Sequence, residues 1–231
     1  MADKLVLEAS LLAFNSRDNQ ILNQQLKTVK DAGVEIIHYD VMDGKFVPEV
    51  AFGPEHLQTL YLMGFKTYVH FMVKNPMKYV KTFLTYPLNA ITFHPEPISH
   101  WKAKRILKRI KRANVLAGIA LKPNSRPEQY RDLIAQSDII TIMGVEPGYG
   151  GQSFMGAIVL RQILEVEKIR QEVNPELIIQ LDGGVNYEVM KITYKHVDNF
   201  ISGSFLMKQK EPRKVVDYVK KIKRGSNGQT K

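Results

Sequence analysis

Ile36-Ile37-His38-Tyr39-Asp40-Val41-Met42-Asp43-Gly44 is the stretch that most restricts the fold of this chain. It reads as an apolar β-strand in which His38 and Asp40, two residues apart, project from the same face close to the strand's end. A second apolar run, Tyr68-Val69-His70-Phe71-Met72-Val73, also has a histidine, and a third ends in Leu181-Asp182-Gly183-Gly184. Polar groups at the ends of apolar strands indicate chemistry at one edge of a sheet.

The rest of the chain alternates between short apolar runs and amphipathic helical patterns. Strands are expected near residues 4–10, 34–41, 66–73, 89–94, 115–121, 138–145, 177–182 and 198–203. Helices are expected near 17–32, 54–63, 76–86, 99–113, 126–136, 156–173, 185–195 and 211–223. Eight strand–helix units in 231 residues predict a single (β/α)8 TIM barrel, since doubly wound sheets usually need fewer strands for this length. We expect one barrel domain at residues 1–224 and a flexible tail at 225–231.

Composition excludes several classes of protein. The chain has no cysteine, so disulfides, thiolate metal ligands and a cysteine nucleophile are excluded. The N-terminus has no leader-like pattern, and no apolar run approaches the ~18 residues that a membrane span requires. These features predict a cytoplasmic protein without a membrane partner.

The net charge of +10 is concentrated in two basic segments, Lys102 to Arg112 and Lys220 to Arg224. Apolar residues interleave with the first segment at helical spacing, which favours a solvated helix face. A basic face can also bind nucleic acid, but no nucleic-acid-binding motif accompanies the charge. We therefore expect no nucleic-acid partner, and at most a preference for an anionic substrate.

Two histidines and two aspartates fall at the carboxyl ends of predicted strands, where (β/α)8 barrels place their chemistry: His38, Asp40, His70 and Asp182. A lone histidine on an apolar strand is usually a hydrogen-bonded core residue, but this combination at one rim favours a metal site. Nitrogen and oxygen ligands suit one divalent ion, Zn, Fe, Mn or Co, among which the sequence does not choose. Zinc is the ion expected in a crystal.

Asp40 and Asp182 lie on different strands of the predicted ring and can approach a substrate from different sides. One carboxylate can remove a proton next to a carbonyl, and the other can return a proton to the opposite face of the planar enediolate. A metal ion would stabilise the negative charge that develops. The pair predicts inversion at a carbon atom; the alternative is that both aspartates are only metal ligands or strand-end caps.

Glycine-rich segments follow the last three predicted strands: Pro147-Gly148-Tyr149-Gly150-Gly151-Gln152, Gly183-Gly184 and Gly203-Ser204. Exposed backbone N–H groups suit a phosphate, and the late loops are the usual phosphate location in this fold. Glycines also serve tight turns, so each segment alone has a structural explanation. Together they predict a phosphate site.

Several rim residues have two interpretations. Met42, Met72 and Met143 end three predicted strands and are expected either as barrel core or as a dry lining over the substrate. His94 also ends a strand and could contact substrate. Asp43 precedes a glycine in a common turn pair, so a structural role is the more expected one.

The residues described so far belong to longer motifs that together match a known family. These are Ala9-Ser10-Leu11-Leu12, residues 38–48 (His-Tyr-Asp-Val-Met-Asp-Gly-Lys-Phe-Val-Pro), Val69-His70-Phe71-Met72-Val73, Ile91-Thr92-Phe93-His94-Pro95-Glu96, residues 143–152, Leu181-Asp182-Gly183-Gly184-Val185 and Ser202-Gly203-Ser204. On them, the chain resembles the ribulose-phosphate 3-epimerase family over nearly its whole length. The block at 38–48 is highly specific, whereas the serine-glycine-serine end is not.

The resemblance implies a TIM barrel of the ribulose-phosphate-binding type that interconverts D-ribulose 5-phosphate and D-xylulose 5-phosphate in the pentose phosphate pathway. It implies that Asp40 and Asp182 are the proton acceptor and donor pair, and that His38, Asp40, His70 and Asp182 bind the divalent metal. Residues that match the family's substrate and phosphate contacts are Ser10, His70, Gly148, Tyr149, Gly150, Gly151, Gly183, Gly184, Gly203 and Ser204. Family members are commonly homo-oligomers, either dimers or hexamers.

The chain departs from the family's pattern at a few positions. Ala9 stands where the first strand usually has proline, Pro97 where a small residue is typical, and Phe205 where alanine is usual. These changes affect loop shape and the exact substrate. They remove no metal ligand and no proton-transfer group.

Three other functions stay open. A sister epimerase acting on a hexulose phosphate would alter the phosphate-side loop, and the intact Gly148-Tyr149-Gly150-Gly151-Gln152 favours the pentose enzyme. Orotidine phosphate decarboxylase shares the barrel but needs an Asp-x-Lys-x-x-Asp array, and Asp40-Val41-Met42-Asp43 has no lysine. A non-catalytic binder of phosphosugars or nucleic acid would use the basic surface, but such a protein could lose Asp40 or Asp182.

Overall fold

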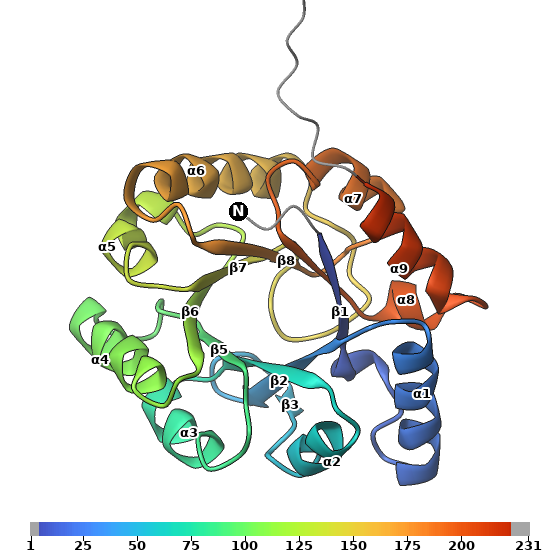
Figure 1. The fold of residues 1–231 in the computed structure, drawn as a ribbon. Coiled ribbons are helices and arrows are strands. Elements are labelled where there is room, and N and C mark those ends of the chain that lie inside the picture. The colour runs from blue at the N-terminus through green and yellow to red at the C-terminus, as the bar shows by residue number, and fades with distance from the viewer. Residues whose placement is uncertain (1–4, 223–231) are drawn as a thin grey trace, which may run out of the picture.

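Eight parallel strands close into a ring in the computed structural model, which describes residues 5–222 (Figure 1). The strands are β1 (Val6–Ser10), β2 (Ile36–Asp43), β4 (Lys66–Met72), β5 (Ala90–Phe93), β6 (Leu116–Leu121), β7 (Ile139–Met143), β8 (Ile178–Asp182) and β9 (Asn199–Ser202). Each strand pairs in parallel with the next, and β1 pairs with both β2 and β9, which closes the ring. The predicted (β/α)8 barrel is confirmed. The expected tail at 225–231 and the expected end of the domain at 224 lie outside the described residues.

Helices surround the ring and follow the predicted order. They are α1 (Asn19–Asp31), α2 (Leu57–Leu62), α3 (Pro76–Phe83), α4 (His100–Lys111), α5 (Arg131–Ile134), α6 (Ala157–Val173), α7 (Tyr187–Thr193), α8 (Ser204–Met207) and α9 (Pro212–Lys221). The single helix expected at 126–136 is instead a 3-10 turn, η2 (Pro127–Tyr130), followed by the short α5. Two other short elements, α8 and the 3-10 turn η1 (Leu11–Ala13), were not predicted. Among the described residues, no helix has the length and apolar character that crossing a membrane would require.

The alternation of side chains along β2 explains how the sequence positions the polar groups. Ile37, Tyr39 and Val41 are almost fully buried and belong to the apolar core that also contains helix residues. His38 and Asp40 therefore project from the opposite face, toward the barrel interior. A shift of the strand by one residue would exchange the two sets, so burial of the apolar set fixes the register.

Register across the barrel places these groups at matching heights. Ser10 on β1 pairs with His38, and Asp40 pairs with His70 on β4. On the far side, Met143 of β7 pairs with Asp182 of β8. Groups from opposite walls consequently meet at the carboxyl ends of the strands.

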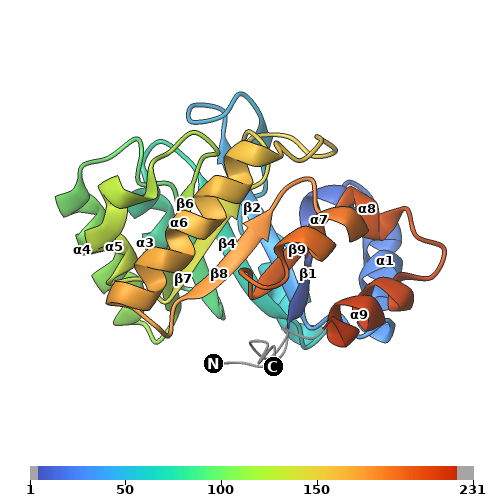
Figure 2. The ribbon, with the colours of Figure 1, turned by 90° about the horizontal axis from the view of Figure 1, so that it is seen from above.

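Two segments rise over these carboxyl ends. One is the hairpin formed by β2 and the two-residue β3 (Val50–Ala51), the only antiparallel pair among the described strands. The other is the loop between β7 and α6. Both stand on the same side of the barrel in Figure 2, where they are blue and yellow. A side chain at Gly148 would lie 3.0 Å from Glu49 Oε2 and 3.3 Å from Val47 Cβ, so the two segments touch.

Candidate active site

The four predicted metal ligands lie together at the carboxyl ends of β2, β4 and β8. One nitrogen or carboxylate oxygen from each of His38, Asp40, His70 and Asp182 lies within 4.8 Å of all the others. His38 Nε2 is 3.4 Å from Asp40 Oδ1 and 3.6 Å from Asp182 Oδ2. His70 Nδ1 is 3.3 Å and 3.6 Å from the same two oxygens. The four side chains therefore surround one point.

The donor set fits a divalent cation. Asp40 Oδ1 is buried and accepts no hydrogen bond within residues 5–222, which leaves a costly unsatisfied carboxylate oxygen in the centre of the cluster. Two imidazole nitrogens face it, His70 Nδ1 at 3.3 Å and His38 Nε2 at 3.4 Å. Two imidazoles and two carboxylates are ligands that Zn, Fe, Mn and Co accept.

The charges of the cluster favour the same ion. Burial lowers the pKa of His38, but the carboxylates of Asp40 and Asp182 outweigh burial and raise the pKa well above its usual 6.5. Burial also lowers the pKa of His70, but the nearby carboxylates of Asp182 and Asp40 outweigh burial and raise it. Burial would raise the pKa of Asp40, but His38 and His70 lower it well below its ordinary value. The cluster thus attracts positive charge between its carboxylates.

A buried carboxylate that the sequence analysis missed holds His38 from behind. Glu8 on β1 is completely buried, and its Oε1 accepts hydrogen bonds from Gln180 Nε2 at 2.6 Å and Asn199 Nδ2 at 2.7 Å. Its Oε2 faces His38 Nδ1 at 3.4 Å. A carboxylate at Nδ1 keeps the hydrogen there and turns the lone pair of Nε2 toward the cluster. The available signal was an acidic residue inside an otherwise apolar strand.

His70 is held in a similar way by a second histidine. His70 Nε2 lies 3.1 Å from His94 Nε2, and His94 Nδ1 lies 3.3 Å from Glu96 Oε2. Glu96 is fixed in turn by Ser125 Oγ at 2.6 Å and by the backbone N–H of Lys122 at 2.9 Å. His94 is fully buried and does not line the pocket described below, so its position in this structure is suited to orienting the ring of His70.

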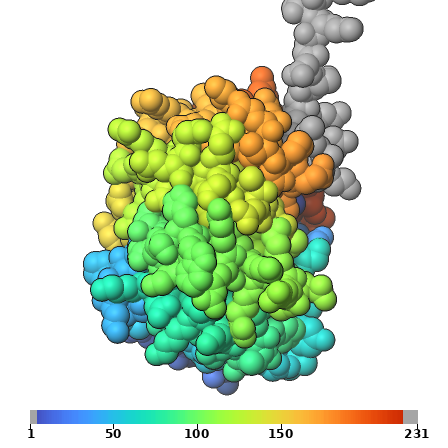
Figure 3. Space-filling model, turned by 90° about the vertical axis from the view of Figure 1, so that its left-hand side faces the viewer, coloured from blue at the N-terminus to red at the C-terminus, as the bar shows by residue number. Residues whose placement is uncertain are grey.

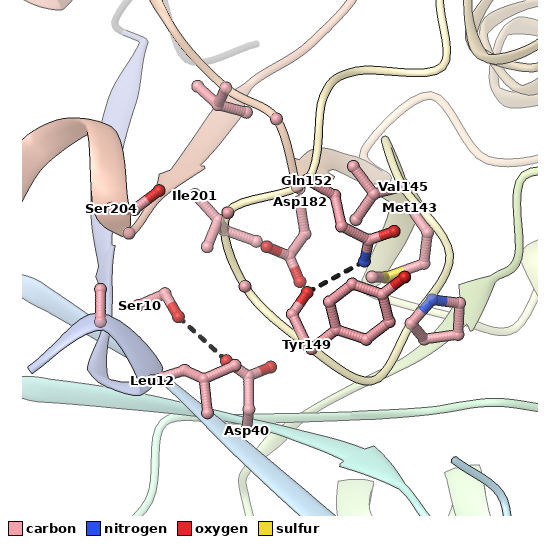
Figure 4. A pocket seen from close by; sticks show the side chains of 18 of the residues that line it. Ser10, Leu12, Asp40, Met143, Val145, Tyr149, Gln152, Asp182, Ile201 and Ser204 are labelled. Atoms are coloured by element: carbon pink, nitrogen blue, oxygen red, sulfur yellow. Dashed lines mark hydrogen bonds between the residues drawn. The ribbon is translucent and has the colours of Figure 1, made fainter. Parts of the chain in front are cut away.

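A pocket of about 620 Å³ opens above the cluster. The predicted residues that line it are Ser10, Asp40, Met42, Met72, Met143, Gly148, Tyr149, Gly150, Gly151, Asp182, Gly183, Gly184, Gly203 and Ser204. Figure 4 shows Asp40 and Asp182 reaching into this space from opposite walls, and Ser10 Oγ donates a hydrogen bond to Asp40 Oδ2 at 3.0 Å. His38 and His70 are buried behind these aspartates. Asn186 and Lys208 also line the pocket, and neither was predicted.

Glycine backbone forms one side of the pocket. Gly184 has φ +68°, and a side chain there would meet the backbone nitrogen of Phe154 at 2.5 Å, so this position admits only glycine. The loop after β7 is pinned by Gln152, whose Nε2 donates to the carbonyls of Glu146 at 2.7 Å and Tyr149 at 2.9 Å. Segments that follow β7, β8 and β9 therefore present backbone to one cavity, an arrangement suited to an anionic group.

Asp43 has the structural role that the sequence favoured. Its Oδ1 accepts from the backbone N–H groups of Lys45 and Phe46, and its Oδ2 accepts from that of Lys74. These bonds hold the turn after β2 against the loop after β4. Asp43 does not line the pocket.

A family model and the curated relatives show one family, and solved structures show the same fold. Residues 6–207 match the model of the ribulose-phosphate 3 epimerase family. A ribulose-phosphate 3-epimerase of Escherichia coli K12 is 34% identical over 206 residues, which cover 87% of this chain and 90% of that protein. The Helicobacter pylori 26695 protein of the same name is 30% identical over 210 residues, covering 90% and 94%. Among solved structures, a Mycobacterium tuberculosis tryptophan synthase chain shares the fold with a TM-score of 0.68 and 14% identity, covering 94% of this chain and 93% of that one.

Proposed function

Because the chain belongs to the ribulose-phosphate 3-epimerase family, and is therefore an epimerase, we propose that it interconverts D-ribulose 5-phosphate and D-xylulose 5-phosphate in the pentose phosphate pathway. The observation that most supports this reaction is the pair of carboxylates, Asp40 and Asp182, that reach into one pocket from opposite walls (Figure 4). Inversion at a carbon atom requires a proton acceptor on one face and a proton donor on the other.

In the proposed mechanism, one of the two aspartates removes the proton from C3 of the sugar and the other returns a proton to the opposite face. The roles exchange when the reaction runs in the other direction. Ser10 Oγ, through its hydrogen bond to Asp40 Oδ2, keeps the Asp40 carboxylate turned toward the substrate. Met42, Met72 and Met143 give the pocket an apolar lining that keeps water from the planar enediolate.

His38, Asp40, His70 and Asp182 would hold one divalent ion, which supplies Lewis-acid stabilisation of the negative charge on the sugar oxygens. Zinc is the ion we propose, with Fe, Mn and Co as alternatives of the same ligand preference. The backbone of Gly148, Tyr149, Gly150, Gly151, Gly183, Gly184, Gly203 and Ser204 would bind the phosphate of the substrate. We also propose a cytoplasmic homo-oligomer, either a dimer or a hexamer.

Turnover in D2O tests the two-base mechanism. Asp40→Asn and Asp182→Asn should each lower kcat by at least about 100-fold, since a positioned acid or base contributes roughly 10²–10⁴. A variant that keeps one carboxylate should still exchange the C3 hydrogen of one epimer with solvent deuterium while forming little of the other epimer. Proton NMR of the sugar measures both events.

Asp217→Asn on α9 is the matched control, because it makes the same change at an exposed position outside the pocket, where Asp217 pairs with Arg213. It should leave kcat unchanged. If Asp40→Asn or Asp182→Asn keeps near-native turnover, the two-base assignment is wrong. A comparison of kcat/KM for the pentulose and hexulose phosphates distinguishes this enzyme from the sister epimerase.

A further inference from the structure

A second cavity, unrelated to the active-site pocket, runs between α3 and α4 on the outside of the barrel. Its volume is about 1290 Å³, roughly twice that of the active-site pocket. Figure 3 views this side of the molecule, where the surface of α4 is green and that of α3 blue-green. We name it the basic groove, because the lysines and arginines that line it are Lys74, Lys81, Lys102, Arg105, Lys108, Arg109 and Arg112.

The cations of the basic groove have no acidic partner in the described part of the chain. None of its lining residues is Asp or Glu, and none of its seven cations forms a salt bridge within residues 5–222. The other lysines of the same helix behave differently: Lys104 pairs with Asp132 at 2.8 Å and Lys111 with Asp138 at 2.7 Å. Neither lines the groove. The barrel therefore neutralises one side of α4 and leaves the other as a concentrated positive field, which is a large part of the net charge of +10.

The spacing of the cations suits a chain of phosphates rather than a single one. Lys102, Arg105, Arg109 and Arg112 recur at three- and four-residue intervals and so form one stripe along α4 and its end. Ten residues of helix are about 15 Å long. That length equals about four nucleotides of a stacked single strand, at 3.4 Å per nucleotide.

An exposed aromatic side chain lies beside this stripe. Trp101 is 62% exposed, although large aromatic side chains are usually buried, and it lines the groove. The Arg105 guanidinium lies 4.6 Å from the centre of its ring and keeps the indole next to the cations. A positive groove combined with an exposed ring on which a base can stack is the arrangement that binds single-stranded nucleic acid without sequence preference.

From these observations we infer that the basic groove binds single-stranded nucleic acid, independently of the active site. The sequence alone favoured a solvated helix face because it showed the charge but neither the cavity nor the one-sided pairing. Only phosphates and a stacked base are recognised, so RNA and DNA of any sequence are expected to bind.

Fluorescence anisotropy with a labelled 12-nucleotide oligouridylate tests the inference on the full chain. About four phosphate contacts give a slope near −3 for the logarithm of the association constant against that of the salt concentration, or about a 50-fold loss of affinity between 50 and 200 mM. Lys102→Gln with Arg109→Gln should halve this slope. Trp101→Ala should weaken binding roughly tenfold and leave the slope unchanged.

Lys104→Gln with Lys111→Gln is the matched control, because it removes two charges from the same helix outside the groove and should retain the slope. Epimerase turnover and circular dichroism should stay unchanged in every variant, which shows that each has folded. Three results would overturn the inference: no oligonucleotide binding at 50 mM salt, an equal loss in the control pair, or tight binding to phosphatidylserine vesicles in place of the oligonucleotide.

Discussion

Replacement of Glu8 by glutamine isolates the contribution of a buried carboxylate to the proposed metal site. Glu8→Gln retains the size of the side chain, and the new amide oxygen can still accept from Gln180 and Asn199. The amide NH2 then faces His38 Nδ1, which must offer its lone pair, so the ring hydrogen moves to Nε2. That nitrogen points toward Asp40 and Asp182, and once protonated it cannot bind a metal ion.

We expect this change to weaken metal binding 10- to 100-fold, the usual cost of losing a partner that orients a ligand. The range corresponds to about 1.4–2.7 kcal/mol. Competition for Zn²⁺ against a chromophoric chelator at pH 7.5 measures it directly. Urea unfolding of the metal-free protein should also show a loss of about 1–3 kcal/mol, because charge-assisted hydrogen bonds become neutral ones.

The control for Glu8→Gln lies in the same hydrogen-bond network. Thr141 Oγ1 donates to Gln180 Oε1 at 2.8 Å, whereas the carboxylate that faces His38 Nδ1 is that of Glu8, so Thr141→Val should destabilise the fold without changing metal affinity. Zn²⁺ binding by Glu8→Gln as tight as that of the unmodified protein would refute the role assigned to Glu8.

Three further predictions follow from the site and the fold. Chelation should abolish turnover, and added divalent metal should restore it; full activity in protein shown by atomic absorption to be metal-free would contradict the metal's role. Gly144→Ala should lower the free energy of unfolding in urea by about 1–3 kcal/mol, because the new Cβ would lie 2.2 Å from the Gly183 carbonyl oxygen; a loss below 0.5 kcal/mol would contradict this. Burial raises the pKa of Glu96, but the hydrogen bond and charge of His94 outweigh burial. The pKa of Glu96 is therefore about 2 in the folded protein, against an ordinary 4.5. Its ionised form therefore stabilises the fold above about pH 4.5, and this is lost as the pH falls toward 2. The stability gap between the unmodified protein and Glu96→Gln should narrow by about 3 kcal/mol over that range, and a gap that does not change with pH would count against the assignment.

The barrel was predictable because its signals are local. Apolar runs and helical periodicity each lie within one element, and the glycines that follow α1 and α2, Gly33 and Gly64, have the positive φ values typical of helix ends. Elements of four residues, such as α5 and α8, have no period to detect, so the sequence overestimated one and missed the other. The predicted metal ligands could be grouped because parallel strands share one edge.

The sequence could not show how deeply each polar side chain is buried or which residue it bonds to. Glu8 meets Gln180 and Asn199, which are 172 and 191 residues away along the chain, and no local pattern links positions so distant. His94 directly follows β5, close to the expected strand end, but only the packing of rings places it behind His70 instead of in the pocket. The sequence showed the positive charge of the segment from Lys102 to Arg112. It could not show that carboxylates pair with the cations on one side of α4 and not with those on the other, because that depends on where α3 and α5 lie.

The bonds of Glu8 also constrain the order in which this protein matures. Glu8 belongs to the first strand, whereas both of its amide donors belong to the last two. Burial of the Glu8 carboxylate without those donors would cost too much free energy. The first strand is therefore expected to pair stably within the barrel only after almost the whole polypeptide has been synthesised. Newly synthesised molecules should accordingly bind the proposed metal ion only after translation, and a chain truncated ahead of residue 199 should not bind it.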